Sequence, residues 1–418
     1  MTTDKLIAKW SAVLDHEGAG KIMDQHKRAV TAQLLENQSL ALASGDAVNA
    51  ESMLMEAPTN TTSGVQNWDP VLMGLVRRSA PNLMAYDIAG VQPMSAPTGL
   101  IFALRSRYDN QTGAEAFFNE ADTAHSGTGT HGSVAAGETG KAMATNAAEA
   151  LGTSGDAWGE MALTIEKITA TAKSRALKAQ YSLEMAQDMK AVHGLDADSE
   201  LANILSTEII AEINRETVRT VYGVAKIGAQ TTTNPGEFDL SVDSDGRWSL
   251  ERYRGLQFQV EREANAIARE TRRGRGNIII CSSDVASALA ASGALEYRGQ
   301  DSNLNIDDTG NTFAGIYNKK YKVYIDPYLP VGAIQGGDLL MVGYKGTNPY
   351  DAGLFYCPYV PLQMMRATSH DDFTPKIGFK TRYAMVANPF AEGISKGDGA
   401  LNANANVYYR KFAVKNLL

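Results

Sequence analysis

Two glycine-rich segments have the spelling of phosphate-binding motifs. Gly127–Gly132 matches G-x-G-x-x-G, and Gly137–Lys141 resembles the end of a phosphate loop. A dinucleotide motif must follow a buried strand and open a helix, but residues 120–126 are polar. The phosphate loop needs glycine where Ala135 stands and serine or threonine where Ala142 stands. We therefore interpret the region as a low-complexity loop without a nucleotide site.

The turn Cys281–Asp284 lies between a strand-like run and an expected helix, where a nucleophile could be exposed. The glycines that flank the serine of a nucleophile elbow are missing, so we interpret Ser283 as a helix cap. Cys281 and Cys357 have neither a metal-ligand nor a redox spacing. The six histidines also form no H-x-x-x-H or H-E-x-x-H pair. We expect no cofactor, no metal and no enzyme; an α/β enzyme using this turn is the remote alternative.

A basic run, Thr271–Gly276, contains Arg272, Arg273 and Arg275 at an expected helix end. Cations there interact favourably with the helix dipole, so a solvated helix terminus is the default interpretation. An ion-pair site between subunits is the sharper hypothesis, and DNA binding comes third.

The segment Leu54-Met-Glu56-Ala57 has the features of a protease site. Its carboxylate follows an apolar residue two positions earlier, in a stretch without periodic structure that a protease can thread. Leu34-Leu-Glu36 has the same pattern, so the pattern alone is weak. Leu54, Glu56 and Ala57 are preferred because they lie at an expected domain boundary.

The whole chain has 418 residues, enough for two or three domains. Its net charge of −8 argues against a protein that coats nucleic acid, and any genome contact would have to be local. No run reaches the roughly 18 apolar residues that span a membrane. We expect a soluble protein made in a reducing cytoplasm.

Periodicity predicts the elements that position these residues. An amphipathic helix is expected from Asp4 to about Leu42, interrupted near Gly18 and Gly20, with its apolar face in need of a partner. A linker is expected over 37–64. A short helix is expected after the cap Asp69, from Pro70 to Arg77 and Arg78, and ended by Pro81. The apolar positions expected on the first helix include Leu6, Trp10, Val13, Ile22, Met23, His26, Val30 and Leu34.

The middle of the chain predicts a long two-stranded arm. Leu100–Tyr108 and Met161–Thr169 are strand-like, and about 112–159 between them is rich in Gly, Ala, Thr and Ser. An isolated hairpin is barely stable in water, so the arm should lie on a neighbour. A long helix is expected from a cap at Ser199, then an alternating α/β unit over 248–344, and short β runs from Gly353.

Five strings, taken in order, resemble the major capsid proteins of T-even-like tailed bacteriophages (myoviruses). They are QPMSAPTGLIFALRSRY (Gln92–Tyr108), TAKSRALKAQYSLEMAQDMKAVHGLDAD (Thr171–Asp198), YCPYVPL (Tyr356–Leu362), GFKTRY (Gly378–Tyr383) and VANPF (Val386–Phe390).

The resemblance implies an α+β chain with the tailed-phage major capsid fold. Its parts would be a removable N-terminal propeptide that interacts with the scaffold (1–56), an N-terminal arm (57–91), an extended loop (92–170), a peripheral domain with a spine helix (171–247), an axial α/β domain (248–344), and a return to the peripheral domain (345–418). A folded insertion in the extended loop, present in larger members, has too few apolar residues here.

The implied function is self-assembly into hexameric capsomers of an icosahedral head enclosing double-stranded DNA, in the virion. A prohead protease would cut after Glu56, preceded by Leu54. Expected partners are other copies, the vertex protein, a scaffold, the protease, a portal and outer decoration proteins, with DNA enclosed without specific binding and no membrane. The alternatives are the related pentameric vertex protein and an encapsulin-like shell protein.

Overall fold

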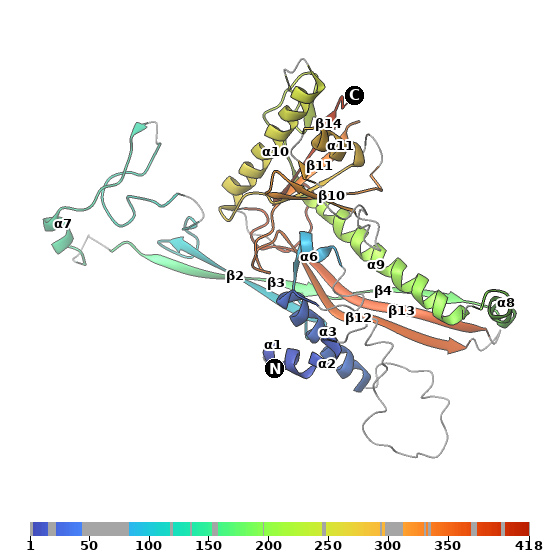
Figure 1. Ribbon diagram of the computed structural model, residues 1–418. Coiled ribbons are helices and arrows are strands. Elements are labelled where there is room, and N and C mark those ends of the chain that lie inside the picture. The colour runs from blue at the N-terminus through green and yellow to red at the C-terminus, as the bar shows by residue number, and fades with distance from the viewer. Residues whose placement is uncertain are drawn as a thin grey trace.

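The computed structural model describes most of the chain. The described residues are 3–15, 22–43, 83–117, 120–133, 136–152, 158–194, 196–244, 248–292, 295–296, 312–329, 332, 336–368, 374–393 and 398–417. Two sheets, one long hairpin and the helices around them make up this part (Figure 1).

The first sheet has the order β1-β12-β13-β4. Its strands are β1 (Gly90–Val91), β12 (Leu354–Thr368), β13 (Pro375–Ala387) and β4 (Lys173–Gln180). The expectation of short β runs after Gly353 is wrong here, because β12 and β13 are 15 and 13 residues long. Pro358 and Pro361 interrupt β12 less than expected, because both lie where its register against β13 shifts.

The second sheet has the order β5-β14-β11-β7-β10-β9-β8, with β6 also paired to β14. Its strands are β5 (Ala225–Ile227), β6 (Glu237–Asp239), β7 (Ile278–Cys281), β8 (Leu295–Glu296), β9 (Thr312–Tyr317), β10 (Tyr321–Ile325), β11 (Asp338–Gly343) and β14 (Asn406–Lys415). The α/β unit expected over 248–344 is present, but β5, β6 and β14 complete its sheet from outside that range. The division into domains stays a prediction.

Four of the described helices lie between residues 183 and 291. They are α8 (Leu183–His193), α9 (Ala197–Val224), α10 (Ser249–Thr271) and α11 (Ser283–Ala291). Two predicted caps are wrong by position. Asp196, rather than Ser199, caps α9 by accepting a hydrogen bond from the Ser199 N–H, and Ser282, rather than Ser283, caps α11 through the Val285 N–H. In both helices the side-chain oxygen of the capping residue accepts from the N–H of the residue three positions later.

The N-terminal segment folds as α1 (Thr3–Lys9), α2 (Ser11–Leu14) and α3 (Gln25–Ala43). The predicted break is present, but Met23 is 88% exposed, contrary to its expected place on the apolar face. The linker does not begin at Asn37, because α3 continues through it. The Asn37 side-chain amide donates to the carbonyls of Met94 and Tyr359, which fixes the end of the helix on β12.

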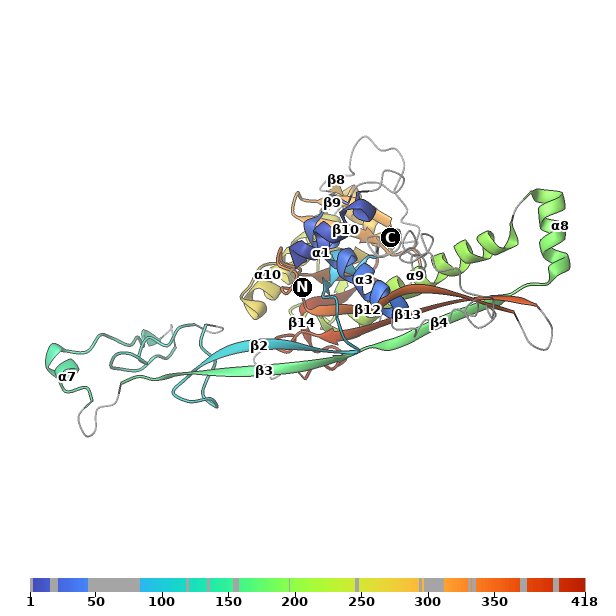
Figure 2. The same ribbon diagram turned by 90° about the horizontal axis from the view of Figure 1, so that it is seen from below.

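The predicted hairpin is confirmed as β2 (Thr98–Tyr108) paired antiparallel with β3 (Met161–Thr171). It projects away from both sheets, while β12, β13 and β4 extend in the opposite direction toward α8 (Figure 2). Short helices α6 (Ala85–Ile88) and α7 (Thr145–Glu149) lie before β2 and in the loop beyond the hairpin. The chain is therefore elongated, with an arm that has few contacts to its own body.

Candidate assembly surface and processing site

One face of the β2–β3 hairpin is a ladder of exposed apolar side chains. Its six large members each expose more than half of their surface: Leu100, Phe102 and Leu104 on β2, and Met161, Leu163 and Ile165 on β3. Leu104 pairs directly with Ile165, and alternation places all six on the same face. The same face also carries Ser106, Lys167 and Thr169, and an exposed face with this many large apolar side chains is typical of a protein interface. We call these six residues the hairpin ladder.

The opposite face is held to the body by a buried charge network. The Arg105 guanidinium is inaccessible to solvent and donates to Glu115 at 2.7 Å, to Glu166 at 3.0 Å and to the Pro389 carbonyl at 3.0 Å. It also lies 4.6 Å from the centre of the Phe390 ring. Because a buried cation needs several partners, the network fixes the angle at which the hairpin leaves the body.

The glycine-rich segment lies in the loop beyond the hairpin. Thr128 and Lys141 form an isolated antiparallel bridge, so Gly127–Gly132 belongs to a loop rather than to a strand–helix junction. None of the described residues from 120 to 152 is buried. The geometry agrees with the interpretation of this segment as a loop.

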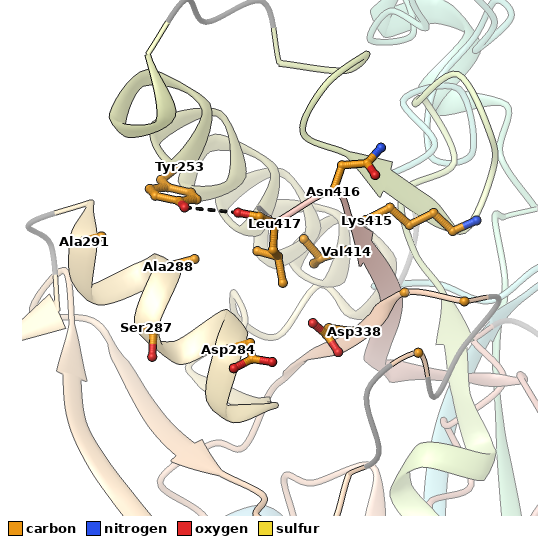
Figure 3. Close-up of a pocket in the computed structure, with 13 residues that line it drawn as sticks. Tyr253, Asp284, Ser287, Ala288, Ala291, Asp338, Val414, Lys415, Asn416 and Leu417 are labelled. Carbon is orange, nitrogen blue, oxygen red and sulfur yellow. Dashed lines mark hydrogen bonds between the residues drawn. The ribbon is translucent and has the colours of Figure 1, made fainter.

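In the Cys281–Asp284 turn, Ser283 and Asp284 are exposed, while Cys281 and Ser282 are buried. Cys281 is completely buried, and burial raises the pKa of its thiol to about 12. Ser282 is engaged as the α11 cap. A cavity of about 640 Å³ lies beside α11, with Asp284 at one side and Asp338 of β11 at another, and the Tyr253 hydroxyl donates to the Leu417 carbonyl (Figure 3). None of the described residues that line it is a cysteine or a histidine.

The three arginines of the basic run lie in different environments. Arg275 pairs with Glu261 and donates to the Tyr321 hydroxyl at 2.6 Å, within the same chain. Arg273 lies 3.8 Å from Asp351 and 5.5 Å from the Phe390 ring centre. Arg272 is exposed in a left-handed conformation at the end of α10. The predicted inter-subunit ion pairs therefore stay a prediction, and Arg275 already has an acidic partner.

The predicted processing residues Leu54, Glu56 and Ala57 lie outside the described residues. The segment before them docks on the first sheet, where Trp10, Leu14, Val30 and Leu35 join the apolar cluster that includes Tyr356 and residues of β13. This docking supplies the partner surface that the amphipathic pattern required.

Within the described residues, no group of three or more His, Cys, Asp or Glu side chains could hold a metal ion. No described helix is long and apolar enough to cross a membrane.

Sequence reasoning predicted the hairpin but missed the hairpin ladder. The signal was present, because every second residue from Leu100 to Leu104 and from Met161 to Ile165 is large and apolar. Alternation alone predicts a strand with one face buried. The structure shows that the body covers the opposite face of the hairpin and leaves the apolar face exposed.

The family model described as "Major capsid protein Gp23" matches residues 65–414. The major capsid protein of Salmonella phage ViI is 40% identical over 100% of this chain and 99% of its own length. That of Enterobacteria phage T4 is 35% identical over 100% of this chain and 99% of its own.

Two further matches are more distant. The capsid vertex protein of Enterobacteria phage T4 is 28% identical over 54% of this chain and 52% of its own length. Among solved structures, the capsid of Myoviridae phage XM1 matches with a TM-score of 0.42 at 8% identity, over 79% of this chain and 92% of that one.

Proposed function

Because this chain belongs to the Gp23 family of major capsid proteins, we propose that it assembles into hexameric capsomers of an icosahedral, DNA-enclosing phage head. It is a structural protein of the capsid shell of a T-even-like phage, with the tailed-phage major capsid fold, and is not an enzyme. The vertex alternative is disfavoured, because similarity to a vertex protein covers about half of the chain and similarity to major capsid proteins covers all of it.

The observation that carries the assembly proposal is the hairpin ladder. Phe102 and Ile165 are 63% and 66% exposed, although each could contribute about 1.5–3 kcal/mol by full burial. A two-stranded arm with this face open to water gains stability by lying across a neighbouring copy. The proposed partner of the ladder is therefore another subunit of the same shell.

Maturation is the second part of the proposal. A prohead protease would cut between Glu56 and Ala57 and remove the segment that contains α1, α2 and α3, after that segment has guided assembly on a scaffold. The amphipathic docking of these helices supports a role before maturation. The other proposed partners are the vertex protein, a portal and outer decoration proteins.

Substitution within the hairpin ladder tests the assembly proposal. We expect Phe102→Asp combined with Ile165→Asp to leave a folded subunit, because both side chains are exposed, but to prevent shell formation. Phe102→Leu combined with Ile165→Leu keeps the face apolar and serves as the matched control. Electron microscopy of the products, with circular dichroism of the subunit, is the measurement. Closed shells from the double aspartate variant would overturn the proposal.

A further inference from the structure

A cavity of about 380 Å³ separates the N-terminal segment from the second sheet. Asp24 and His26 line it on the N-terminal side. Lys320 lines it from the turn before β10, Lys322 from β10 and Lys345 from the loop after β11. Three ammonium groups that belong to the body of the protein thus line one partly open cavity, at which Lys320 and Lys322 are exposed.

The Lys345 backbone is fixed at this cavity. The Asn277 side chain accepts a hydrogen bond from the Lys345 N–H at 3.0 Å and donates one to its carbonyl at 2.6 Å. An isolated bridge to Ala352 closes the loop on the other side. Among the described residues, no carboxylate oxygen lies within the 4.0 Å of the Lys345 Nζ that would make an ion pair.

The charges around Lys345 do not balance. Burial lowers its pKa to about 8, the carboxylates of Asp87 and Asp24 oppose that shift, and the nearby Lys322 and Lys27 add to it. The ammonium is still mostly charged at pH 7. Lys320 has one distant partner, Glu261, at 3.9 Å. The lining of the cavity therefore carries three lysines against two carboxylates, Asp24 and Asp87.

We propose that Lys320, Lys322 and Lys345 form a phosphate-binding site that becomes more accessible to the backbone phosphates of packaged DNA when the N-terminal segment, which contributes Asp24 and His26 to its wall, is removed. The inference rests on the proposed cleavage after Glu56. Lysine binds phosphate as a point charge, without the fixed geometry that arginine imposes, which suits a contact that reads no sequence.

Cleavage changes the site in two ways. It removes the wall formed by Asp24 and His26, which opens the cavity on the side that the N-terminal segment covers. It also leaves Asp87 as the one acidic residue of the described lining, opposite the three lysines. An acidic chain thereby acquires a local basic site at the step at which DNA enters. This is the local genome contact that a net charge of −8 still permits.

The first experiment uses the uncut chain, so its outcome does not depend on the cleavage site. We expect equilibrium dialysis at low salt to show inorganic phosphate bound more tightly by Asp24→Asn than by the unmodified chain. We expect weaker binding by Lys322→Gln and Lys345→Gln. Lys380→Gln, an exposed lysine on β13, is the control for loss of one charge. Equal binding by all four variants would overturn the site.

The second experiment separates DNA from free phosphate. Chains cut by their protease in assembled shells and then dissociated should bind a short duplex more tightly than uncut chains. In the cut chain, each Lys→Gln change should lower the slope of log Kd against log salt by about 1. Lys322 is exposed, so its variant should fold even if Lys345→Gln does not. Phosphate binding that duplex DNA does not displace would overturn the DNA contact.

Discussion

The two thiols differ from catalytic cysteines in their environment. Burial raises the pKa of both Cys281 and Cys357 to about 12, so almost no thiolate exists at pH 8. We predict that a thiol-specific reagent at pH 8 leaves both unmodified in the folded subunit. The same reagent should modify both after unfolding in urea, which is the control. Rapid reaction of either thiol in the folded chain would contradict the structure.

Arg105 is the residue whose loss should cost most at the base of the hairpin. Arg105→Met would leave Glu115 and Glu166 buried side by side without their cation, at a cost of about 3–5 kcal/mol. Arg107 is more exposed, lies 3.9 Å from Glu166 and donates to the Gly113 carbonyl and the Thr164 hydroxyl. Because Arg105 still pairs with Glu166 when Arg107 is lost, Arg107→Met should cost less, about 1–2 kcal/mol. Urea unfolding of the subunit measures both free energies. Similar losses in the two variants would contradict the role of the network.

A triple variant tests why Arg105→Met should lose stability. If the loss in Arg105→Met comes from stranded carboxylates, adding Glu115→Leu and Glu166→Leu should recover much of the stability. If the triple variant is no more stable than the single one, the loss would instead come from the contacts of the arginine with Pro389 and Phe390.

At the scale of elements, the hairpin and its loop are the parts with the least cover from their own chain. The described residues from 120 to 152 are all at least partly exposed, and the hairpin ladder faces solvent. We predict that amides of about 119–159 exchange rapidly in a dilute subunit and become protected in the shell. Amides of β7 and β11, which are fully buried strands, provide the slow control in the same experiment. Strong protection of the loop in the dilute subunit would show that it has a core of its own.

At the scale of the whole molecule, the proposed cut changes the net charge of the subunit. Residues 1–56 contain five Lys or Arg and eight Asp or Glu, so removal changes the net charge from −8 to −5. We predict that the N-terminal residue of the mature chain is Ala57, as measured by N-terminal sequencing of heads. Glu56→Gln keeps the shape and removes the charge, and should block the cut. A mature chain that begins at Asn37, or at the original N-terminus, would contradict the site.

The loss of acidic peptide from the shell should lessen repulsion toward incoming DNA. Screening limits that effect to about 10 Å at moderate salt. The reduced repulsion therefore acts only on DNA close to the inner surface of the shell. The proposed lysine site would act over the same short distance.

The sequence by itself determined the family, the long arm and the α/β alternation, because order, periodicity and charge are local properties of a chain. It also excluded the phosphate-loop and metal motifs by their spacing. The tertiary structure decided what covers each face. The exposed hairpin ladder, the three lysines around one cavity and the pairing of Arg275 with Glu261 each join residues of different elements or loops. Burial depends on which segments pack together, and spacing along the sequence does not fix that.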